Sequence, residues 1–219
     1  GRRPQPLFVL RELPCPYLPG RLERKVITSL DVPDAALLHG QLSRAGFRRT
    51  HGFAYRPACP GCDACVPVRV PAATYAPSKS LRRTARRNAD LSVTCRPPRA
   101  TEEQYDLFAR YIAARHGDGE MRHMSEADYA QMIEDTPVPG GVAELRTPDG
   151  RLCAALLYDE LDDGVSAVYS FFDPEEAPRS LGSFMVHWLI DHARAQGWPY
   201  VYLGYWIAAS PKMAYKARF

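Results

Sequence analysis

Three consecutive β-rich runs in the second half of the chain restrict its fold more than any other feature. They are "VAELRT" (142–147), "LCAALLYDEL" (152–161) and "VSAVYSFFD" (165–173), and the turn-forming stretches "PDG" and "DDG" separate them. Short turns of this kind predict an antiparallel meander. An amphipathic segment (179–197) and another β-rich run (199–206) come next. They predict a helix and then a strand that returns beside the third run.

A strand and two helices are predicted before this meander. The run "LSVTCR" (91–96) is typical of a short strand, and a helix (101–117) follows that opens with the capping pattern of Thr101 and Gln104. A second helix begins at Ser125. The resulting order is strand, two helices, three strands, helix and strand. This order resembles the GNAT fold of the N-acetyltransferases, so the predicted fold class is α+β, with a GNAT-like mixed sheet flanked by helices. Such a fold-level analogy specifies neither a donor nor an acceptor.

The first 77 residues have a different character. They contain four cysteines, many prolines and one clear helical segment (34–47), for which Gly46 is the expected terminator. A segment this small and irregular usually needs a metal or a large neighbour to hold it. We therefore predict two units, a small irregular cysteine-containing N-terminal module (1–77) and a GNAT-like transferase domain (78–219).

Composition places the chain among soluble globular proteins. Hydrophobic residues make up 46% and charged residues 24% of the chain. No run approaches the ~18 apolar residues that a membrane span needs, so no membrane partner is expected. The first stretch, "GRRPQPLFVL" (1–10), lacks the apolar core of a signal peptide, which predicts a cytoplasmic, reducing location. Clustered cysteines in such a location indicate a metal site or catalysis.

Four cysteines form the clearest candidate metal site. Cys59, Cys62 and Cys65 follow a C-x2-C-x2-C pattern, and Cys15 in "PCPY" is the natural fourth thiolate. Four thiolates suit a tetrahedral zinc ion and equally an iron-sulfur cluster, and the spacing does not choose between them. An empty thiol cluster is the third alternative. The remaining two cysteines lie in β-rich runs and are expected to be small buried residues: Cys95 and Cys153.

A basic run lies at the start of the predicted transferase domain. Within "SKSLRRTARRN" (78–88), one lysine and four arginines occur without any acidic residue. This density suits phosphate contacts, and the alternative is an ordinary solvated helix face. The net charge of +3 for the whole chain does not distinguish phosphate contacts from a solvated helix face. The basic residues are Lys79, Arg82, Arg83, Arg86 and Arg87.

The segment "RSLGSF" (179–184) bears on whether this fold would use coenzyme A. Acetyltransferases hold the coenzyme A pyrophosphate with a Q/R-x-x-G-x-G/A segment at this place. Arg179 and Gly182 fit the pattern, whereas Phe184 replaces the small last residue. A benzyl group is expected to obstruct the approach of phosphate oxygens to the helix amides, which argues against ordinary coenzyme A binding. The alternative is a plain loop that leads into an amphipathic helix.

Seven motifs are spread in order over nearly the whole chain: "PCPYLPGR" (14–21), "RPACPGCDACVPVRV" (56–70), "SKSLRRTARRNADL" (78–91), "YIAARHGDGEM" (111–121), "SAVYSFFDP" (166–174), "RSLGSF" (179–184) and "YLGYWIAASPKMAYKARF" (202–219). Each motif alone is weak, but the combination is highly specific. It resembles the bacterial arginyl-tRNA-protein transferase family, specifically the short aspartate/glutamate leucyltransferase type.

The resemblance implies an aminoacyltransferase that adds leucine from charged tRNA to the N-terminal α-amine of proteins starting with Asp or Glu, and so marks them for degradation. The implied partners are leucyl-tRNA and acidic protein N-termini, and no organic cofactor is implied. In the family, the pattern continues beyond the position of Phe219. The basic run (78–88) is then expected to contact tRNA phosphates. Three alternatives stay open: arginine as the transferred residue, a coenzyme A-dependent acetyltransferase, and a non-catalytic RNA-binding protein.

The implied reaction is aminolysis of an activated ester by an α-amine. That amine has an unperturbed pKa of about 7.7–8.0, so we expect orientation and oxyanion stabilisation to matter more than a strong base. Strand alternation predicts Ser166 and Tyr169 on opposite faces, and core packing explains Tyr169 as well as catalysis does. The candidate catalytic residues are Ser166, Tyr169, Asp173 and Tyr205.

The acidic side chain of the acceptor requires a cation, and a bidentate arginine suits a carboxylate best. Arg69, four residues after Cys65, is expected to be held at the substrate cleft by the N-terminal module. His116 is a candidate proton carrier, with a structural hydrogen bond as the alternative. A leucine donor is expected to have an apolar pocket, whereas an arginine donor would require a carboxylate there. The candidate substrate-binding residues are Arg69, Arg115, His116, Arg179, Ser180, Gly182, Lys212 and Lys216, and Lys79 is a further candidate cation.

Overall fold

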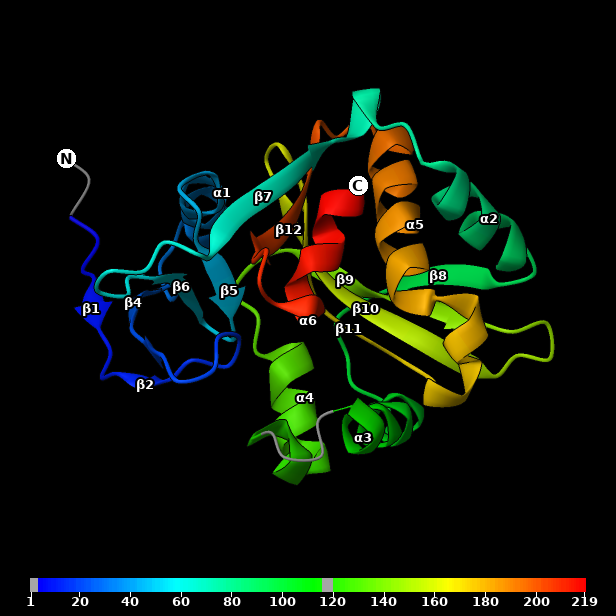
Figure 1. Ribbon diagram of the computed structural model, residues 1–219, viewed down its shortest axis with the longest axis horizontal. Helices are drawn as coiled ribbons and strands as arrows, with labels where there is room; N and C mark the ends of the chain where they lie inside the picture. The colour runs from blue at the N-terminus through cyan, green and yellow to red at the C-terminus, as the bar shows by residue number, and fades with distance from the viewer. Residues whose placement is uncertain (1–3, 116–119) are drawn as a thin grey trace.

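The computed structural model describes residues 4–115 and 120–219 and is built around a six-stranded mixed sheet (Figure 1). The strands lie in the order β7-β12-β11-β10-β9-β8. All neighbours in this sheet are antiparallel except β11 and β12, which are parallel. The strands are β7 (Val66–Pro71), β8 (Ser92–Arg96), β9 (Gly140–Arg146), β10 (Leu152–Leu161), β11 (Gly164–Phe172) and β12 (Tyr200–Trp206).

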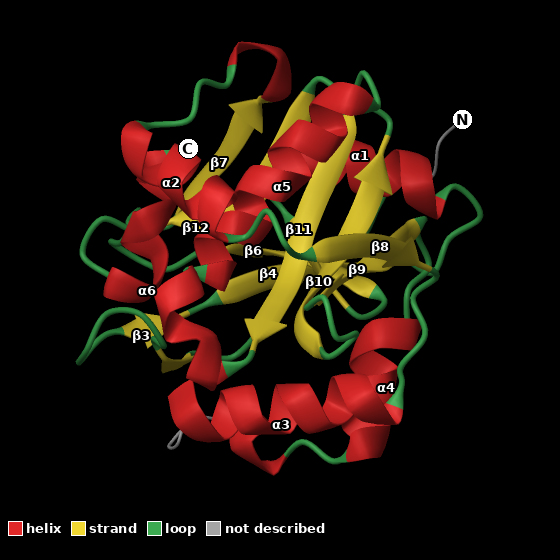
Figure 2. Ribbon diagram, turned by 90° about the vertical axis from the view of Figure 1, so that its right-hand side faces the viewer, coloured by secondary structure: helices red, strands yellow, loops and turns green. Residues whose placement is uncertain are grey.

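Helices cover both faces of the large sheet (Figure 2). On one face α5 packs on a core that includes Leu156 and Val201, and α2 lies against α5. On the other face α3 and α4 pack on a core that includes Leu157 and Phe171. Leu156 and Leu157 are neighbours on β10, so the alternation of strand side chains supplies a core on each side. The helices are α1 (Ala35–Arg44), α2 (Lys79–Arg87), α3 (Glu102–Arg115), α4 (Glu126–Glu134), α5 (Leu181–Ala195) and α6 (Pro211–Ala214).

The N-terminal third forms a small sheet of its own beside the large one (Figure 1). Its strands lie in the order β1-β4-β6-β5, and β2 pairs with β3 separately. The irregular structure predicted for this part of the chain is instead a set of strands of two to five residues, which are too short to leave a readable periodicity in the sequence. The next strand, β7, falls within 1–77 yet pairs with β12 in the large sheet. The N-terminal strands are β1 (Phe8–Val9), β2 (Leu13–Pro14), β3 (Leu22–Glu23), β4 (Lys25–Ser29), β5 (Arg48–Thr50) and β6 (Phe53–Pro57).

A buried ion-pair cluster joins the small sheet to the large one. The Arg49 guanidinium on β5 donates two hydrogen bonds of 2.7 Å to the Asp159 carboxylate on β10. His39 Nε2 on α1 lies 2.9 Å from the same carboxylate. Burial alone would raise the pKa of Asp159, but the hydrogen bonds from His39 and Arg49 hold this pKa below its usual value. Charges buried on both sides of the contact therefore fix β5 and α1 against the large sheet.

Strands β11 and β12 separate soon after they meet. Their parallel pairing covers Gly164 to Ser166 against Tyr200 to Tyr202, although both strands continue well beyond it. A register shift in the pairing with β10 marks a bulge in this part of β11, and Gly204 of β12 has a φ of 74° at a second shift. Bulges bend strands and strengthen their twist. As a result, an opening between β11 and β12 begins beyond Ser166.

The bulge in β11 also corrects a prediction about its faces. Ser166 lies opposite Asp159, and Tyr169 lies opposite Leu157. Asp159 and Leu157 are two residues apart on β10, so they point to the same face of the sheet. Ser166 and Tyr169 therefore share a face, and the prediction of opposite faces was wrong. Strict alternation does not allow for the extra residue that a bulge inserts.

The predicted order of elements over 91–206 is confirmed. The Gln104 N–H donates a 3.2 Å hydrogen bond to the Thr101 hydroxyl at the start of α3, and Gly46, with a φ of 85°, follows the end of α1. Cys153 is buried as predicted. Cys95 is exposed instead, because β8 is an edge strand of the large sheet. Within the two described ranges, no helix is long and apolar enough to cross a membrane.

Candidate active site

A pocket of about 430 Å³ lies beside the opening between β11 and β12. Ser166 stands in its wall at the last parallel pair, next to Tyr202 of β12. Three arginines also line the pocket: Arg44 at the end of α1, Arg48 on β5 and Arg69 on β7. Concave sites of a few hundred Å³ with a few convergent polar groups are typical of ligand binding. We therefore take this pocket as the candidate active site.

Arg48 occupies the opening itself. Its Nη2 donates hydrogen bonds to the backbone oxygens of Ala167 at 2.6 Å and Val168 at 3.2 Å, both on β11. On the other side the guanidinium lies directly against Gly204 of β12, where an added β-carbon would collide with it. Within the part of the chain that the structure describes, Arg48 has no carboxylate within 4.0 Å. Its charge is therefore hydrogen-bonded but not neutralised by an acid there.

The other two arginines of the pocket have acidic partners. Arg69 donates to the Tyr202 hydroxyl at 3.0 Å and lies 3.8 Å from Asp163. Arg44 lies 2.7 Å from Asp162 and 3.5 Å from Asp163. The hydrogen bond to Tyr202 raises the pKa of Arg69, and the hydrogen bond to Asp162 raises the pKa of Arg44. Both guanidinium groups stay charged, and both remain partly exposed.

Lys216 reaches the same opening from the other face of the sheet. The segment after β12 folds back as α6 and η4 (Tyr215–Arg218) and lies between β12 and α5 (Figure 1). Lys216 Nζ donates a 2.8 Å hydrogen bond to the backbone oxygen of Tyr205, the residue after Gly204. Burial and then the positive charge of Arg48 lower the pKa of Lys216 to about 7. Of the predicted substrate-binding cations, Lys216 and Arg69 are thus brought to the opening and its pocket.

The two candidate catalytic tyrosines are held by contacts outside the opening between β11 and β12. The Tyr205 hydroxyl donates to the backbone oxygen of Gly46 at 2.7 Å. The Tyr169 hydroxyl lies 3.7 Å from Met121 Sδ, and its ring packs against Phe108. Burial raises the pKa of both tyrosines, so both stay protonated at neutral pH. Neither residue is in the pocket wall.

Asp173 and Arg179 form ion pairs away from the pocket. The buried Asp173 carboxylate accepts a 2.6 Å hydrogen bond from Arg151 and also caps the short helix η3 (Pro174–Arg179). Arg179 binds the two carboxylate oxygens of Asp90 at 2.8 Å and 2.9 Å, and so ties the start of α5 to the end of α2. The structure brings neither candidate to the pocket wall.

The segment 179–184 serves as the start of α5. Ser180, with a φ of 54°, is the helix N-cap. A β-carbon on Gly182 would lie 3.3 Å from the Phe172 ring, so only a small residue fits there easily. Phe184 is buried in the core, because its position on α5 faces the sheet. The Phe184 ring therefore lies between α5 and the sheet, whereas the sequence predicted that it obstructs the amides at the start of the helix.

Two further substrate-binding candidates, Arg115 and Lys212, lie outside the pocket wall. Arg115 at the end of α3 donates to the Tyr111 hydroxyl at 3.4 Å, and its guanidinium lies 5.3 Å from the centre of the Phe172 ring. Lys212 is exposed at the start of α6. His116 lies outside the described residues.

The basic run forms α2 and keeps its charges on the outer side. The Ser78 hydroxyl caps the helix by accepting a 3.3 Å hydrogen bond from the Leu81 N–H. Leu81 and Thr84 are buried, whereas all five predicted basic side chains are exposed. Arg87 also donates to the backbone oxygen of Pro178, which anchors the helix beside η3. The helix therefore presents a positive surface next to α5.

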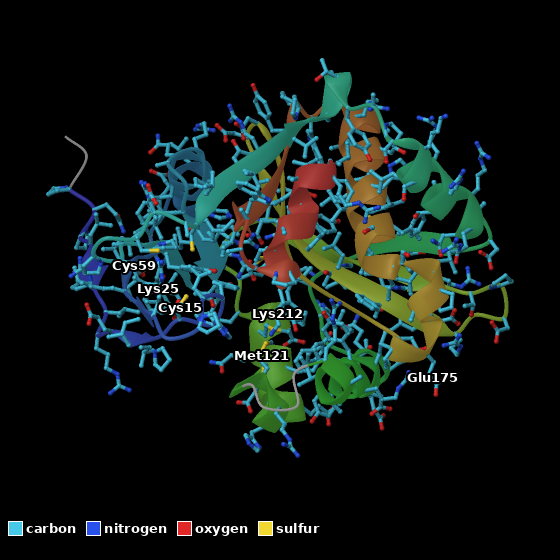
Figure 3. The ribbon with its side chains drawn as sticks, viewed as in Figure 1. Cys15, Lys25, Cys59, Met121, Glu175 and Lys212 are labelled. Atoms are coloured by element: carbon cyan, nitrogen blue, oxygen red, sulfur yellow. The ribbon has the colours of Figure 1, made fainter. Side chains whose placement is uncertain are left out.

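The predicted ligand cysteines surround one small pocket of about 40 Å³ in the N-terminal module, where Figure 3 labels two of them. Burial and then the charges of the other three thiols raise the pKa of Cys65 to about 11. Among the described residues, no group of three or more His, Cys, Asp or Glu side chains is arranged to hold a metal ion. The donors suit zinc or an iron-sulfur cluster chemically, but no ligand geometry is already formed. The four residues are Cys15, Cys59, Cys62 and Cys65.

Of the pocket's three arginines, Arg44 and Arg48 were not predicted from the sequence. Arg48 stands directly before Arg49 in "GFRRT" (46–50), and nothing local distinguishes a ligand-binding arginine from an ion-pair partner in such a doublet. Alternation along β5 sends the two side chains in opposite directions. Only the docking of β5 on the large sheet assigns Arg49 to Asp159 and Arg48 to the opening.

Comparisons with solved structures confirm the predicted GNAT-like fold class. The structure of L-PGS from Bacillus licheniformis has a TM-score of 0.52 at 15% sequence identity, and the match covers 66% of this chain and 47% of that chain. The C-terminal domain (DUF2156) of an Agrobacterium fabrum protein has a TM-score of 0.51 at 19% identity, covering 78% of this chain and 52% of that chain. At these identities the likeness concerns the fold alone.

Sequence comparisons confirm the predicted resemblance. The aspartate/glutamate leucyltransferase of Gluconacetobacter diazotrophicus is 56% identical over 218 residues, which cover 100% of this chain and 84% of that protein. The protein of the same name from Paramagnetospirillum magneticum is 52% identical over 218 residues, covering 100% and 89%. Residues 13–83 match the N-terminal part of the arginine-tRNA-protein transferase family, and residues 103–219 match its C-terminal part. The chain therefore belongs to the arginine-tRNA-protein transferase family.

Proposed function

We propose that this chain transfers leucine from charged tRNA to the N-terminal α-amine of proteins that begin with Asp or Glu, in the cytoplasm, and so marks them for degradation. Its relatives at 56% and 52% identity carry the name aspartate/glutamate leucyltransferase. The observation that carries the proposal is Arg48, a cation with no acidic partner among the described residues, held in the opening of an acyltransferase-like sheet. The acidic side chain of the acceptor supplies the missing carboxylate.

The acceptor's acidic side chain binds in the arginine-lined pocket. Arg48 uses Nη2 for two backbone oxygens, and its other N–H groups are left to pair with a carboxylate. Arg44 and Arg69 lie at the partly exposed rim, where Asp162 and Asp163 balance their charge, so Arg48 supplies the uncompensated positive charge of the pocket. That charge also disfavours N-terminal Lys or Arg, because like charges would then face each other. When the side chain of the acceptor's first residue is bound to Arg48, the α-amine of that residue lies next to Ser166, at the opening between β11 and β12.

The charged tRNA approaches from the face that carries α5. The exposed basic side chains of α2 lie on that side and bind phosphates of the tRNA. The aminoacyl ester then reaches the opening between β11 and β12.

At the opening, the α-amine attacks the carbonyl carbon of the ester. A C–N bond forms as the carbonyl electrons move to oxygen, and the C–O bond to the ribose then breaks. Binding both substrates in one site removes the entropic cost of bringing them together during the reaction. Ser166, in the pocket wall, supplies a hydroxyl for the oxyanion.

The direct test of this function uses peptides that differ only in their first residue, Asp, Glu, Ala or Lys. Each is incubated with the protein and total charged tRNA, and the added residue is identified by mass. We expect leucine on the Asp and Glu peptides only. No addition to the acidic peptides would contradict the proposal, and arginine in place of leucine would correct its donor.

Replacing Arg69 by glutamine should lower kcat/KM for Asp and Glu peptides, mainly through KM. A hydrogen bond to a charged group contributes about 1.5–3 kcal/mol, which corresponds to a loss of about 10- to 100-fold. Steady-state kinetics with the two peptides measures the effect. Arg99→Gln, at an exposed arginine outside the pocket wall, is the matched control and should match the wild type. An unchanged KM in Arg69→Gln would remove Arg69 from the acceptor site.

Replacing Arg83 and Arg86 together by alanine should weaken tRNA binding and reduce its salt dependence. Each phosphate contact contributes about 0.7–0.9 to the slope of log K against log salt, so two contacts contribute roughly 1.4–1.8. Filter binding of leucyl-tRNA at several salt concentrations measures the slope. The double variant of Arg11 and Arg99 removes the same charge from exposed positions outside α2. Equal slopes for the two double variants would exclude α2 as the tRNA contact.

We also propose that Cys15, Cys59, Cys62 and Cys65 bind zinc or an iron-sulfur cluster after small adjustments of their side chains. The support is the shared pocket of four soft donors. A bound metal would tie residue 15 to residues 59–65 and so stiffen the N-terminal module. Metal analysis and visible absorbance of the protein and of Cys62→Ser test this. Metal in the wild type and its loss in the variant are expected, whereas a metal-free wild type after reconstitution would contradict the proposal.

A further inference from the structure

The C-terminal segment brings a lysine to the place where the proposed reaction needs a proton carrier. Arg218 fastens this segment by donating hydrogen bonds to Ser80 on α2 at 3.2 Å and to Ser183 on α5 at 3.5 Å. Within the fastened segment, Lys216 Nζ reaches the backbone oxygen of Tyr205 at 2.8 Å. The preceding residue of β12 is the glycine against which Arg48 lies. Two cations from distant parts of the chain therefore meet at one point on β12.

The surroundings of Lys216 make it chemically different from a surface lysine. Within residues 4–115 and 120–219, no carboxylate is among the groups that shift its pKa, so no described acid stabilises its ammonium form. Burial and then Arg48 lower its pKa to about 7, and the neutral and charged forms therefore coexist near neutral pH. An efficient acid-base group has this property. Among the described residues, the titratable groups on the elements around it are Arg48 from β5, Tyr205 from β12, Lys212, Tyr215 and Arg218 from its own segment, and Tyr111 and Arg115 from α3, which face Tyr215.

We propose that Lys216 is the proton-transfer residue of the aminoacyl transfer, an assignment that rests on the proposed function. The attacking nitrogen must lose a proton once the C–N bond forms, and the ribose oxygen must gain one as the C–O bond breaks. The neutral Lys216 amine takes the first proton, and the resulting ammonium group delivers it to the ribose oxygen. The lysine is regenerated and no co-reactant is needed. The hydrogen bond to Tyr205 uses one N–H and leaves the nitrogen lone pair free to accept the proton.

A purely structural lysine would tie η4 to β12 through the same hydrogen bond. Arginine at this position keeps the charge and a donor, but its pKa lies above about 12 and it does not titrate near neutral pH. Lys216→Arg therefore preserves the structural role and removes proton transfer. Lys216→Ala removes both, and an added primary amine can replace only the chemical function.

The experiment measures single-turnover leucine transfer from leucyl-tRNA to a Glu-initiated peptide between pH 5.5 and 9. Wild type, Lys216→Arg, Lys216→Ala and Arg99→Lys are compared, and thermal melting checks the fold of each. We expect the wild-type rate to rise as the pH passes through about 7. Lys216→Arg should lose the part of this rise that belongs to the lysine, keep the rise that the peptide's α-amine gives at about pH 7.7–8.0, and fall about 100-fold or more, a typical contribution of acid-base catalysis. Methylamine or ethylamine should partly restore Lys216→Ala, and Arg99→Lys, at an exposed arginine outside the pocket wall, should keep the wild-type pH profile.

The titration of the peptide's own α-amine appears in all four profiles and therefore does not interfere with the comparison. If Lys216→Arg folds and keeps the wild-type pH profile within about threefold in rate, Lys216 is structural and the assignment is overturned. Failure of amine rescue in a folded Lys216→Ala would count against it in the same way. If the wild type itself adds no leucine, the proposed function fails. The wild type alone gives that result, so it is distinguishable from a failure of the Lys216 assignment.

Discussion

Arg48→Met is expected to lose leucyl transfer to Asp and Glu peptides by about 100-fold or more in kcat/KM. Removing one partner of a buried, hydrogen-bonded charge pair costs about 2–5 kcal/mol, and each 1.4 kcal/mol is a factor of ten. The methionine keeps much of the arginine stem but lacks the guanidinium that holds Ala167 and Val168 of β11. Steady-state kinetics with acidic peptides measures the loss, and a thermal melt confirms that the variant is folded.

Two further variants sharpen the Arg48 test. Arg48→Lys should not restore activity, because a single ammonium group does not reproduce the planar fork that reaches two backbone oxygens and a carboxylate. Arg11→Met, at an exposed arginine of the N-terminal module, is the matched control and should behave like the wild type. Activity of a folded Arg48→Met within about threefold of the wild type would show that the acceptor carboxylate binds elsewhere.

Asp159→Asn is expected to lower the free energy of unfolding by about 3–5 kcal/mol, because it leaves the buried charge of Arg49 without its carboxylate. Denaturant unfolding, with the m-value checked for a two-state transition, measures the change. Asp162→Asn is the control: its partner Arg44 is partly exposed, and such pairs contribute roughly 0–1 kcal/mol. A loss below about 1 kcal/mol in Asp159→Asn would mean that water or another group compensates Arg49.

The same cluster predicts a pH effect with a defined sign. The pKa of Asp159 is held below its usual value in the folded chain, so the unfolded chain binds the proton more readily. Its stabilising contribution is therefore complete well above the unfolded pKa of about 3.9 and is lost as the pH falls through the folded pKa.

Replacing Arg49 and Asp159 together by Met and Leu should recover most of the stability that Asp159→Asn loses, because a packed apolar pair often substitutes for a buried ion pair.

The candidate site was predictable only in part. The basic helix and three of the four clustered cysteines were predictable because their residues are close in sequence and share one chemistry, whereas Cys15 lies 44 residues before Cys59. Asp173 and Arg179 were chosen for their types and places, yet each is already paired with an opposite charge. Pairing of this kind depends on which side chains meet across the fold, and one sequence does not record it.

The sequence by itself determined the order of the strands and helices, the GNAT-like fold class, the capping of α3 and the helical stop at Gly46. These features depend on periodicity and on turn and cap chemistry within a few residues, so a local pattern is enough to predict them. Only the tertiary structure decided which groups form the site. Arg48 and Lys216 are far apart along the chain and meet only because β5 is clamped to the large sheet and the last segment folds back on β12. A bulge of one residue in β11 then placed Ser166 and Tyr169 on the same face of the sheet, whereas strict alternation predicts opposite faces.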